Sequence, residues 1–347
     1  MEVGPLGVFH LKRLWSRMMT TFGGWVYEEP SVDEWDFDKI VIHGLGLNLE
    51  ETFQYLAQKR PSYSEFEQWV IQKNEGNLHK AQVDKINAAV GETTDKRNSQ
   101  RAKQEIYDAE PVLSAEDLTF WEENGYLILH HAVPEENCQA AEQAIWESMG
   151  MDSSNPDTWY QNSQRHGIMV QFFNHPALET NRRSPRIHKA FAQLWGTADL
   201  WVTVDRVSFN PPERRNWHFP GPKLHWDTSL DQPIPFDVSG LLYLTDTLAD
   251  QGAFTCVPGF HRRIADWLGS LPPGADPRKE DLEKLGAVAI PGKQGDLIIW
   301  HQALPHGSRP NYACRPRMVQ YLSMYPTRRK LHFDSIDRKI SDARFQR

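Results

Sequence analysis

Two residues in the stretch "GPKLHWDTSL", His225 and Asp227, are of types that bind metal ions. They are separated by Trp226, and residues i and i+2 of an extended chain point to the same face, so the imidazole and the carboxylate would lie side by side. The pattern alone is weak, because 14 histidines and 46 acidic residues in 347 produce about two such pairs by chance, and two occur. The second pair is His332 and Asp334.

A site for non-haem iron(II) requires a second histidine from a distant strand and open coordination positions. The stretch "DLIIWHQALPHGS" offers two candidates, His301 and His306, at the end of a strongly apolar run. The residue types leave the choice between them open. The pair His332 and Asp334 has no histidine after it and lies in the charged C-terminal tail, so we interpret it as surface.

An arginine that could hold a carboxylate follows this run. The planar guanidinium matches a carboxylate in a bidentate way, and "HGSRPNYACRPRMVQYLSMY" contains Arg309, Arg315 and Arg317. Arg317 opens the next predicted strand and is best placed to point into a barrel, whereas the other two suit a surface turn. Arg206, on the predicted strand before the metal pair, is interpreted either as a contact to a co-substrate or substrate or as a structural ion pair.

These residues must be positioned by the second part of the chain, in which short strands predominate. The pattern "SAEDLTFWEEN" predicts a capped helix that ends at Gly125, followed by a strand over Tyr126 to Leu129. A further helix is predicted over 134–149. Turns rich in Pro, Gly and Asp separate the other predicted strands, which are 200–209, 239–247, 253–257, 287–290, 296–300 and 317–325. This pattern favours an antiparallel sandwich or barrel, with cupin-like jelly rolls among the candidates.

The first 105 residues show a different, helical pattern. Apolar residues recur at helical spacing in 48–60 and 79–90, and "SEFEQWVIQK" opens with a Ser and a Glu in capping positions. A charged stretch over 91–105 is interpreted as a solvated link. We therefore predict a helical N-terminal extension over 1–105 and a β-domain over 106–347, with the helices docked on the flank of the β-domain. The basic, apolar stretch near the N-terminus is interpreted as an amphipathic docking helix, and a mitochondrial presequence is the alternative.

The composition excludes several classes of protein. A formal net charge of −8 and a pI near 6.0 argue against a nucleic-acid-binding surface. The apolar runs fall far short of the roughly 18 to 20 residues that a membrane span requires. Three scattered cysteines suggest neither a disulfide framework nor a zinc finger. We expect a cytoplasmic protein with no membrane or nucleic-acid partner, and the oligomeric state stays open.

Several ordered motifs over about 113–325 resemble those of the phytanoyl-CoA dioxygenase family of iron(II)- and 2-oxoglutarate-dependent oxygenases. They are the helix and strand "FWEENGYLIL", the "NPP" that precedes "HWD", the hairpin "DTLADQG" that leads to "VPGFH", and the "HGS" that follows a "GD" strand. An arginine, Arg317, stands eleven places after the second histidine. The resemblance implies a mainly β fold with flanking helices, built on a double-stranded β-helix (jelly-roll, cupin-like) core.

The resemblance also implies the roles of the candidate residues. It makes His225, Asp227 and His306 the iron(II) ligands, and it selects Arg317 with Ser308 for the distal carboxylate of 2-oxoglutarate. His301 is then a core residue or a residue behind the ligands. Trp217, Trp226 and Trp300 are candidates to line the pocket.

The activity implied is oxidation of a small-molecule substrate with iron(II), 2-oxoglutarate and O2, releasing succinate and CO2. The retained carboxylate of Asp227 favours hydroxylation, or a desaturation or ring-forming variant of the same oxidation, over halogenation, because related halogenases have a small residue there. A cupin-like metal-binding protein or isomerase without oxygenase activity is one alternative. An interaction protein whose function lies in residues 1–105 is the other.

Overall fold

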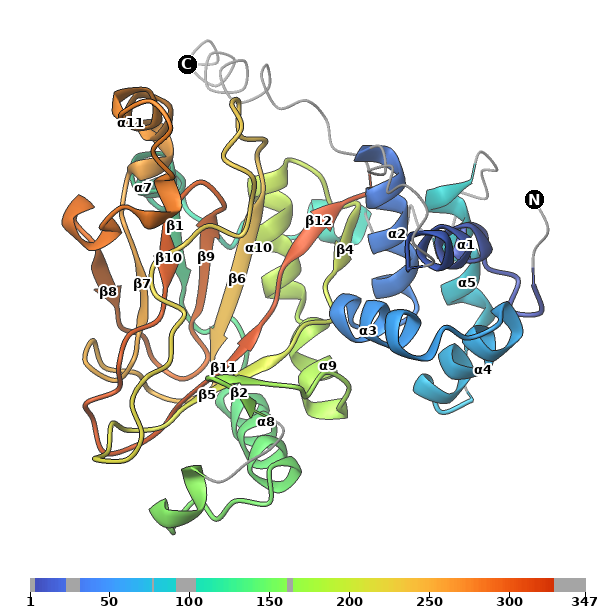
Figure 1. Ribbon diagram of the computed structural model, residues 1–347, viewed down its shortest axis with the longest axis horizontal. Helices are drawn as coiled ribbons and strands as arrows, with labels where there is room; N and C mark the ends of the chain where they lie inside the picture. Colours follow the sequence, from blue (N-terminus) through green and yellow to red (C-terminus); the bar gives the residue numbers. More distant parts are fainter. Residues whose placement is uncertain (1–3, 23–31, 77, 92–103, 161–164, 328–347) are drawn as a thin grey trace.

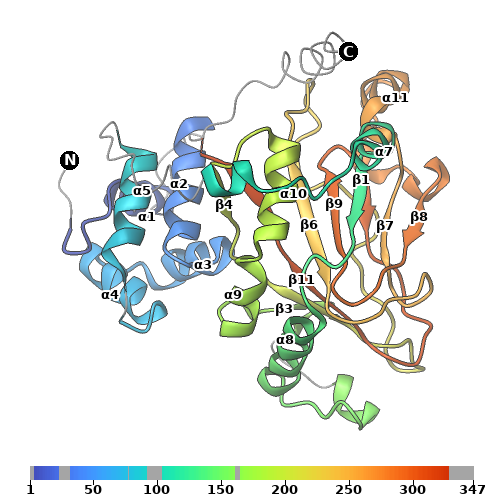
Figure 2. The ribbon, with the colours of Figure 1, turned by 180° about the vertical axis from the view of Figure 1, so that it is seen from behind.

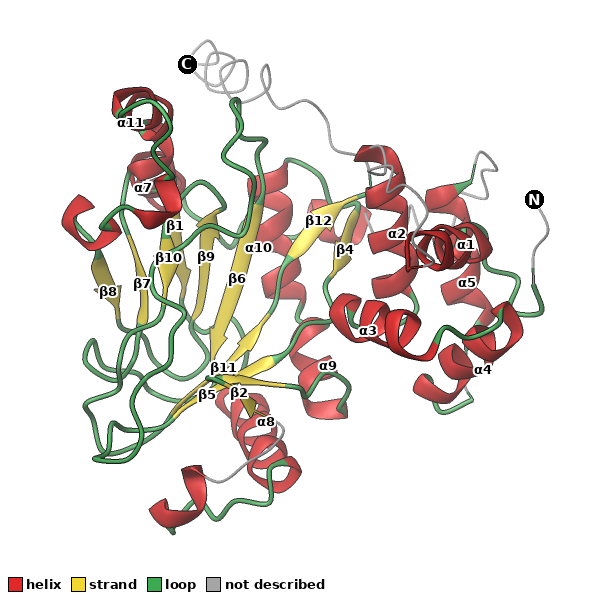
Figure 3. Cartoon of the chain, viewed as in Figure 1, coloured by secondary structure: helices red, strands yellow, loops and turns green. Residues whose placement is uncertain are grey.

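The computed structural model places the helices of the first 91 residues at one end of the molecule, and the strands with the remaining helices at the other (Figures 1 and 3). The residues that it describes are 4–22, 32–76, 78–91, 104–160 and 165–327. The pair His332 and Asp334 and most of the charged link over 91–105 lie outside them.

The strands form three antiparallel sheets. The large sheet has the order β1-β9-β6-β11-β5-β3-β2. Its strands are β1 (Tyr126–Leu129), β2 (Arg165–His166), β3 (Met169–Val170), β5 (Val207–Asn210), β6 (Val238–Tyr243), β9 (Leu297–His301) and β11 (Arg317–Tyr321). A small sheet joins β10 (His306–Gly307), β7 (Phe254–Cys256) and β8 (Val288–Ile290), and β4 (Leu200–Val202) pairs with β12 (Met324–Pro326).

Both faces of the large sheet are buried, and apolar residues fill most of β9 and β6. On β9, Leu297 and Ile299 face a core formed with the helices, whereas Ile298 and Trp300 face a second core shared with Phe254 of β7. The alternation follows from the two-residue period of a strand. The small sheet therefore packs against one face of the large sheet, and helices cover the other face (Figure 2).

Helices after residue 113 support the large sheet. Ser114 and Asp117 form a capping box at the start of α7 (Ala115–Asn124), and Gly125 ends this helix with φ 72°, as the sequence predicted. The other helices of this part are α8 (Glu135–Ser148), α9 (Pro176–Arg182), α10 (Pro185–Trp195) and α11 (Ile264–Ser270). The sequence patterns did not predict α9, α10 and α11. Along the described residues, no helix combines the length and apolarity needed to cross a membrane.

Five further helices lie among the described residues of the first 91. They are α1 (Leu11–Phe22), α2 (Val32–Gly44), α3 (Leu49–Lys59), α4 (Tyr63–Lys73) and α5 (Lys80–Val90). The cap of α4 is Ser62, which forms a capping box with Glu65, and not the Ser at 64 that the sequence interpretation used. The helix α2 was missed because Ile40, Val41 and Ile42 are all buried, so it shows no amphipathic period.

These N-terminal helices pack on the edge formed by β4 and the segment after it. Asn48 donates a hydrogen bond of 2.7 Å from Nδ2 to the carbonyl oxygen of Val204, and both residues are buried. The ammonium of Lys85 lies 4.4 Å from the ring centroid of Trp201. Their apolar residues join the core of the large sheet in one continuous cluster. The division of the chain at residue 105 stays a prediction.

Asn48 serves two purposes, and this generates a test. Its side chain also caps α3 by accepting a hydrogen bond of 3.0 Å from the Glu51 amide. We expect Asn48→Ala to lower the free energy of unfolding by about 2 kcal/mol, because it removes a cap and leaves a buried carbonyl without its donor. Ser62→Ala, which removes an exposed cap only, should cost about 1 kcal/mol. Chemical denaturation measures both, and equal losses would show that the contact to Val204 contributes nothing.

Candidate active site

Three residues that could hold a metal ion meet on the face of the large sheet turned toward the small sheet. One ligand atom from each of His225, Asp227 and His306 lies within 4.8 Å of the others. The Nε2 atoms of His225 and His306 lie 3.3 Å and 3.1 Å from the two carboxylate oxygens of Asp227. Two imidazoles and one carboxylate are a donor set that suits iron(II) with open positions. We call these residues the triad.

Backbone pairing brings the two histidines together. His225 and His306 exchange both backbone hydrogen bonds, at 2.9 Å and 3.0 Å, although only His306 belongs to a strand. Gly307 allows this approach, because a Cβ there would lie 2.7 Å from the carbonyl oxygen of Lys223. The segment "KLHWD" is thus held by one isolated bridge and not by the strand that the sequence interpretation considered.

The side chains of both histidines are oriented by backbone carbonyls. The Nδ1 of His225 lies 2.8 Å from the oxygen of Lys223, and the Nδ1 of His306 lies 3.1 Å from the oxygen of Leu304. A carbonyl only accepts, so each Nδ1 donates its proton to that carbonyl, and Nε2 is the nitrogen that faces Asp227 and would bind a metal once it is deprotonated. The arrangement of the imidazoles therefore fits a metal ion between them and the carboxylate.

Asp227 is held in its ionised form. Hydrogen bonds with His225 and then with His306 keep the pKa of this carboxyl well below its usual range. Burial alone would lower the pKa of His225, but the hydrogen bond with Asp227 leaves it raised. The carboxylate and the two imidazoles are therefore already in contact, in the arrangement that binding of one metal ion would require.

Trp226 and His301 point away from the triad. Trp226 is 3% exposed, and its Nε1 donates to the oxygen of Ala303 at 3.0 Å, so it faces the opposite way from its two neighbours, as the spacing predicted. His301 packs among the rings of Trp121, Phe236 and His261, and burial lowers its pKa to about 3. Of the two histidines that the sequence left open, the structure brings His306 to the triad.

A cavity of about 430 Å³ opens beside the triad. Trp300 and Tyr321 line it, and so does Ser308, whose hydroxyl accepts a hydrogen bond of 3.0 Å from Nη2 of Arg317. Trp300 was one of three tryptophans suggested for the pocket. Tyr321 was missed, but it stands four residues after Arg317 on β11, and this even spacing on one strand could have indicated it.

Arg317 is a buried cation without an acidic partner among the described residues. Its side chain is fully buried, Nη1 donates to Ser208 at 3.1 Å, and Nε has no hydrogen-bond partner in the described part of the chain. A buried charge balanced only by hydroxyls is costly, so the site is suited to an anion. Arg309, in contrast, pairs with Glu283 at 3.0 Å, and Arg315 is exposed, as predicted for a turn.

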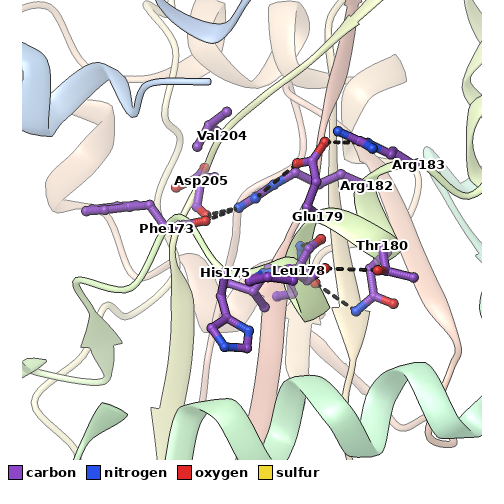
Figure 4. A network of polar contacts seen from close by, with 12 residues as sticks. Phe173, His175, Leu178, Glu179, Thr180, Arg182, Arg183, Val204 and Asp205 are labelled. Atoms are coloured by element: carbon purple, nitrogen blue, oxygen red, sulfur yellow. Dashed lines mark hydrogen bonds and ion pairs between the residues drawn. The ribbon is translucent and has the colours of Figure 1, made fainter. Parts of the chain in front are cut away.

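Arg206 lies at the boundary of this cavity. It forms ion pairs with Glu50 of α3 and with Asp205, the second at 3.5 Å between Nε and Oδ1. It also lines the cavity, so the structure contains the ion pair of one interpretation, and contact with a ligand stays a prediction. Buried Arg182 holds the backbone next to Arg206. Its Nη2 donates to the carbonyl oxygens of Asp205 at 2.9 Å and Phe173 at 2.8 Å (Figure 4).

A second cavity, of about 400 Å³, adjoins the first and was not foreseen from the sequence. Asp227 and His306 of the triad line both cavities. Its outer wall comes from the N-terminal helices, through the side chains of Lys39, His43, Asn48, Leu49 and Glu50.

The close approach at Gly307 can be tested directly. Gly307→Ala should push the Lys223 carbonyl and the His225 bridge away from β10, lowering the free energy of unfolding by about 1 to 3 kcal/mol and weakening metal binding. Gly269→Ala is the matched control, because a Cβ at this helical glycine meets nothing within 4 Å. Denaturation and anaerobic titration with iron(II) measure the two effects. Unchanged metal affinity in Gly307→Ala would show that the bridge does not set the triad.

This chain is similar to several known proteins. A Dictyostelium discoideum protein provisionally named a phytanoyl-CoA dioxygenase is 25% identical over 259 residues, which cover 60% of this chain and 74% of that protein. The solved non-haem α-ketoglutarate-dependent carbocyclase SnoK from nogalamycin biosynthesis is 20% identical, with a TM-score of 0.46 over 67% of this chain and 94% of its own. EctD from S. alaskensis with bound Fe is 19% identical, with a TM-score of 0.46 over 62% of this chain and 78% of its own.

These two structural likenesses are distant, and the assignment does not depend on them. The family model of phytanoyl-CoA dioxygenase (PhyH) matches residues 121–319, which is more than half of the chain. The matched segment includes the triad, Ser308 and Arg317, and the cofactors expected from the sequence, iron(II) and 2-oxoglutarate, are those of this family. The chain belongs to the phytanoyl-CoA dioxygenase family.

Proposed function

We propose that this protein is an iron(II)- and 2-oxoglutarate-dependent dioxygenase that hydroxylates a small molecule. One O2 and one 2-oxoglutarate are consumed for each C–H bond oxidised; one oxygen atom enters the substrate, the other enters succinate, and CO2 leaves. The observation that carries the proposal is that one cavity is lined by the triad and by Ser308, behind which lies Arg317, a buried arginine without an acidic partner among the described residues. Family membership supports the same conclusion.

In this proposal the triad holds the metal through Nε2 of His225, Nε2 of His306 and the carboxylate of Asp227. When bound, iron(II) supplies the binding and activation of O2. Because Nδ1 of each histidine is engaged by a carbonyl, neither ring needs to change tautomer or rotate when the metal arrives. The retained Asp227 occupies a coordination position that a halide would need, which favours hydroxylation over halogenation.

Arg317 and Ser308 would hold the distal carboxylate of 2-oxoglutarate. The guanidinium is already fixed by Ser208 and Ser308, so little side-chain entropy is lost on binding. Phe254 and Trp300 line the same cavity and give it an apolar part. An isomerase or a metal-binding protein would have no need of a buried arginine here, so this residue disfavours the alternative.

The proposal extends to the architecture. We infer that the two facing antiparallel sheets form a double-stranded β-helix over 106–347, with residues 1–105 as a helical extension. The support is the core between the sheets, to which Tyr243 and Trp300 of the large sheet and Phe254 of the small sheet all contribute.

Metal binding by the triad gives the first test of this function. His225→Ala, Asp227→Ala and His306→Ala should each weaken iron(II) binding by more than about 100-fold, since each removes one of three ligands, a larger loss than the 10- to 100-fold typical of outer-shell changes. Metal content after anaerobic loading, with a chelator as competitor, measures this. His301→Ala is the control and should keep its iron. Loss of iron in this control, with retention in His306→Ala, would reverse the choice of histidine.

Co-substrate binding gives a second, separate test. Arg317→Ala should weaken 2-oxoglutarate binding to the iron-loaded protein by at least about tenfold, because one charge-assisted hydrogen bond contributes about 1.5 to 3 kcal/mol. Arg317→Lys keeps the charge but not the fork and should fall between the two. Calorimetry under anaerobic conditions measures the affinity. Exposed Arg315→Ala should match the unaltered protein, and an equal loss in it would refute the assignment to Arg317.

A further inference from the structure

The corner between α2 and α3 reaches the triad from outside the matched family segment. Five of the residues 39–50 line the second cavity, and this cavity shares six lining residues with the first, namely Asp205, Arg206, Asp227, Ser239, His306 and Ser323. We propose that this corner and Arg206 form the substrate-binding wall of the active site and select a small polar substrate that is neutral or positively charged. The inference rests on the proposed function, because only a working triad makes this wall part of an active site.

The second cavity adjoins the triad. Asp227 and His306 line both cavities, so a molecule in the second cavity reaches the open side of the triad. The cavity with Ser308 is the one suited to 2-oxoglutarate, since Arg317 bonds to that residue. The second cavity is therefore the space left for the substrate. The family match begins at residue 121, so the corner between α2 and α3 lies outside the matched segment, whereas Arg206 lies within it.

Hydrogen bonds fix the corner between α2 and α3 against the segment after β4. The corner is tied to the segment after β4 by the bond from Asn48 to the Val204 carbonyl, and Nδ1 of His43 lies 3.2 Å both from the Val204 amide and from the Leu47 carbonyl oxygen. Burial lowers the pKa of His43 to about 4, so its imidazole is neutral at physiological pH. From the opposite side, Arg182 holds the Asp205 carbonyl (Figure 4). A wall fixed from both sides can discriminate between substrates.

The charged groups that line the second cavity disfavour an anionic substrate. Both cations of the second cavity already stand beside acids: Arg206 with Glu50 and Asp205, and Lys39 with Asp36 at 2.7 Å. Asp237 and Asp227 of the triad bring the carboxylates of the lining to four, with Glu50 and Asp205. An anionic substrate would meet these carboxylates and find each cation engaged, which disfavours it. The phosphates of an acyl-CoA are an extreme case.

The second cavity is also lined by polar, uncharged residues. The hydroxyls of Ser239 and Ser323 line both cavities, close to the triad. Ser323 accepts a hydrogen bond of 3.1 Å from the Gly240 amide and keeps its own hydroxyl proton for another acceptor. Hydroxyls and carboxylates together suit a substrate that carries hydroxyl or amino groups. Glu50, with 40% of its side chain exposed, is the carboxylate through which the N-terminal helices would contact it.

The experiment uses the full chain loaded with iron(II) and 2-oxoglutarate. Two sets of probes are offered: polar molecules without phosphate (amino acids, polyamines and sugars) and acyl-CoA thioesters, with palmitoyl-CoA as the reference. Substrate-stimulated formation of succinate is measured in oxygenated buffer, and thermal stabilisation is measured without oxygen. We expect at least one polar probe, and no thioester, to stimulate turnover and stabilise the protein. Stimulation by a thioester, or by no polar probe, overturns the assignment of the substrate class.

The wall itself is tested with a matched pair of variants. Glu50→Gln should raise the KM for the stimulating probe by about tenfold, the equivalent of one lost charged contact, while the KM for 2-oxoglutarate stays unchanged. Glu51→Gln removes the same charge one residue later, where the partner is Lys73 of α4, and should change neither KM. A Glu50→Gln enzyme indistinguishable from Glu51→Gln, or one in which both KM values rise together with a loss of thermal stability, overturns the role of the wall.

The two levels of proposal fail differently. Absence of iron or 2-oxoglutarate binding in the unaltered protein would overturn the proposed dioxygenase function. Normal binding of both, with the wrong class of probe or an inert Glu50, would overturn only the inference about the wall.

Discussion

The structure of the site depends on one pair of backbone hydrogen bonds, those that His225 and His306 exchange. Neither histidine lies in a long strand, since β10 has two residues and the segment around His225 has only this bridge. An antiparallel pair fixes both the separation and the relative orientation of the two side chains. Everything else in the site, including the position of Asp227 two residues along, follows from this contact and from the small residue, Gly307, that permits it.

The large sheet extends this local order across the molecule. Because side chains alternate, β11 directs Arg317, Val319 and Tyr321 toward the small sheet, whereas Met318 and Gln320 face the helices. The same strand therefore supplies a polar cavity on one face and a support on the other. The two-residue period of the strand is the reason that the buried arginine and a tyrosine of the cavity are separated by four residues.

Local signals were sufficient for part of this result. The strand Tyr126–Leu129 and the glycine that precedes it were predicted with their observed bounds, because a capping box and a left-handed glycine are encoded in a few neighbouring residues. The predicted strand over 200–209 breaks into β4 and β5, since the residues between them bond to α3 and to Arg182 far along the chain. The second cavity could not be foreseen for the same reason: its walls meet only through tertiary packing.

The order in which the elements leave the ribosome gives the docking of α2 a further meaning. Lys39 lies 5.0 Å from the ring centroid of Tyr325, and His43 packs 6.0 Å from the same ring. Tyr325 belongs to β12, the last strand that the structure describes, so one of the earliest helices waits for one of the latest strands before its surface is complete. Such contacts between distant parts of a chain close slowly, and apolar surface stays exposed meanwhile. A chaperone that covers the apolar surface of the N-terminal helices during synthesis would therefore protect the site that they later enclose.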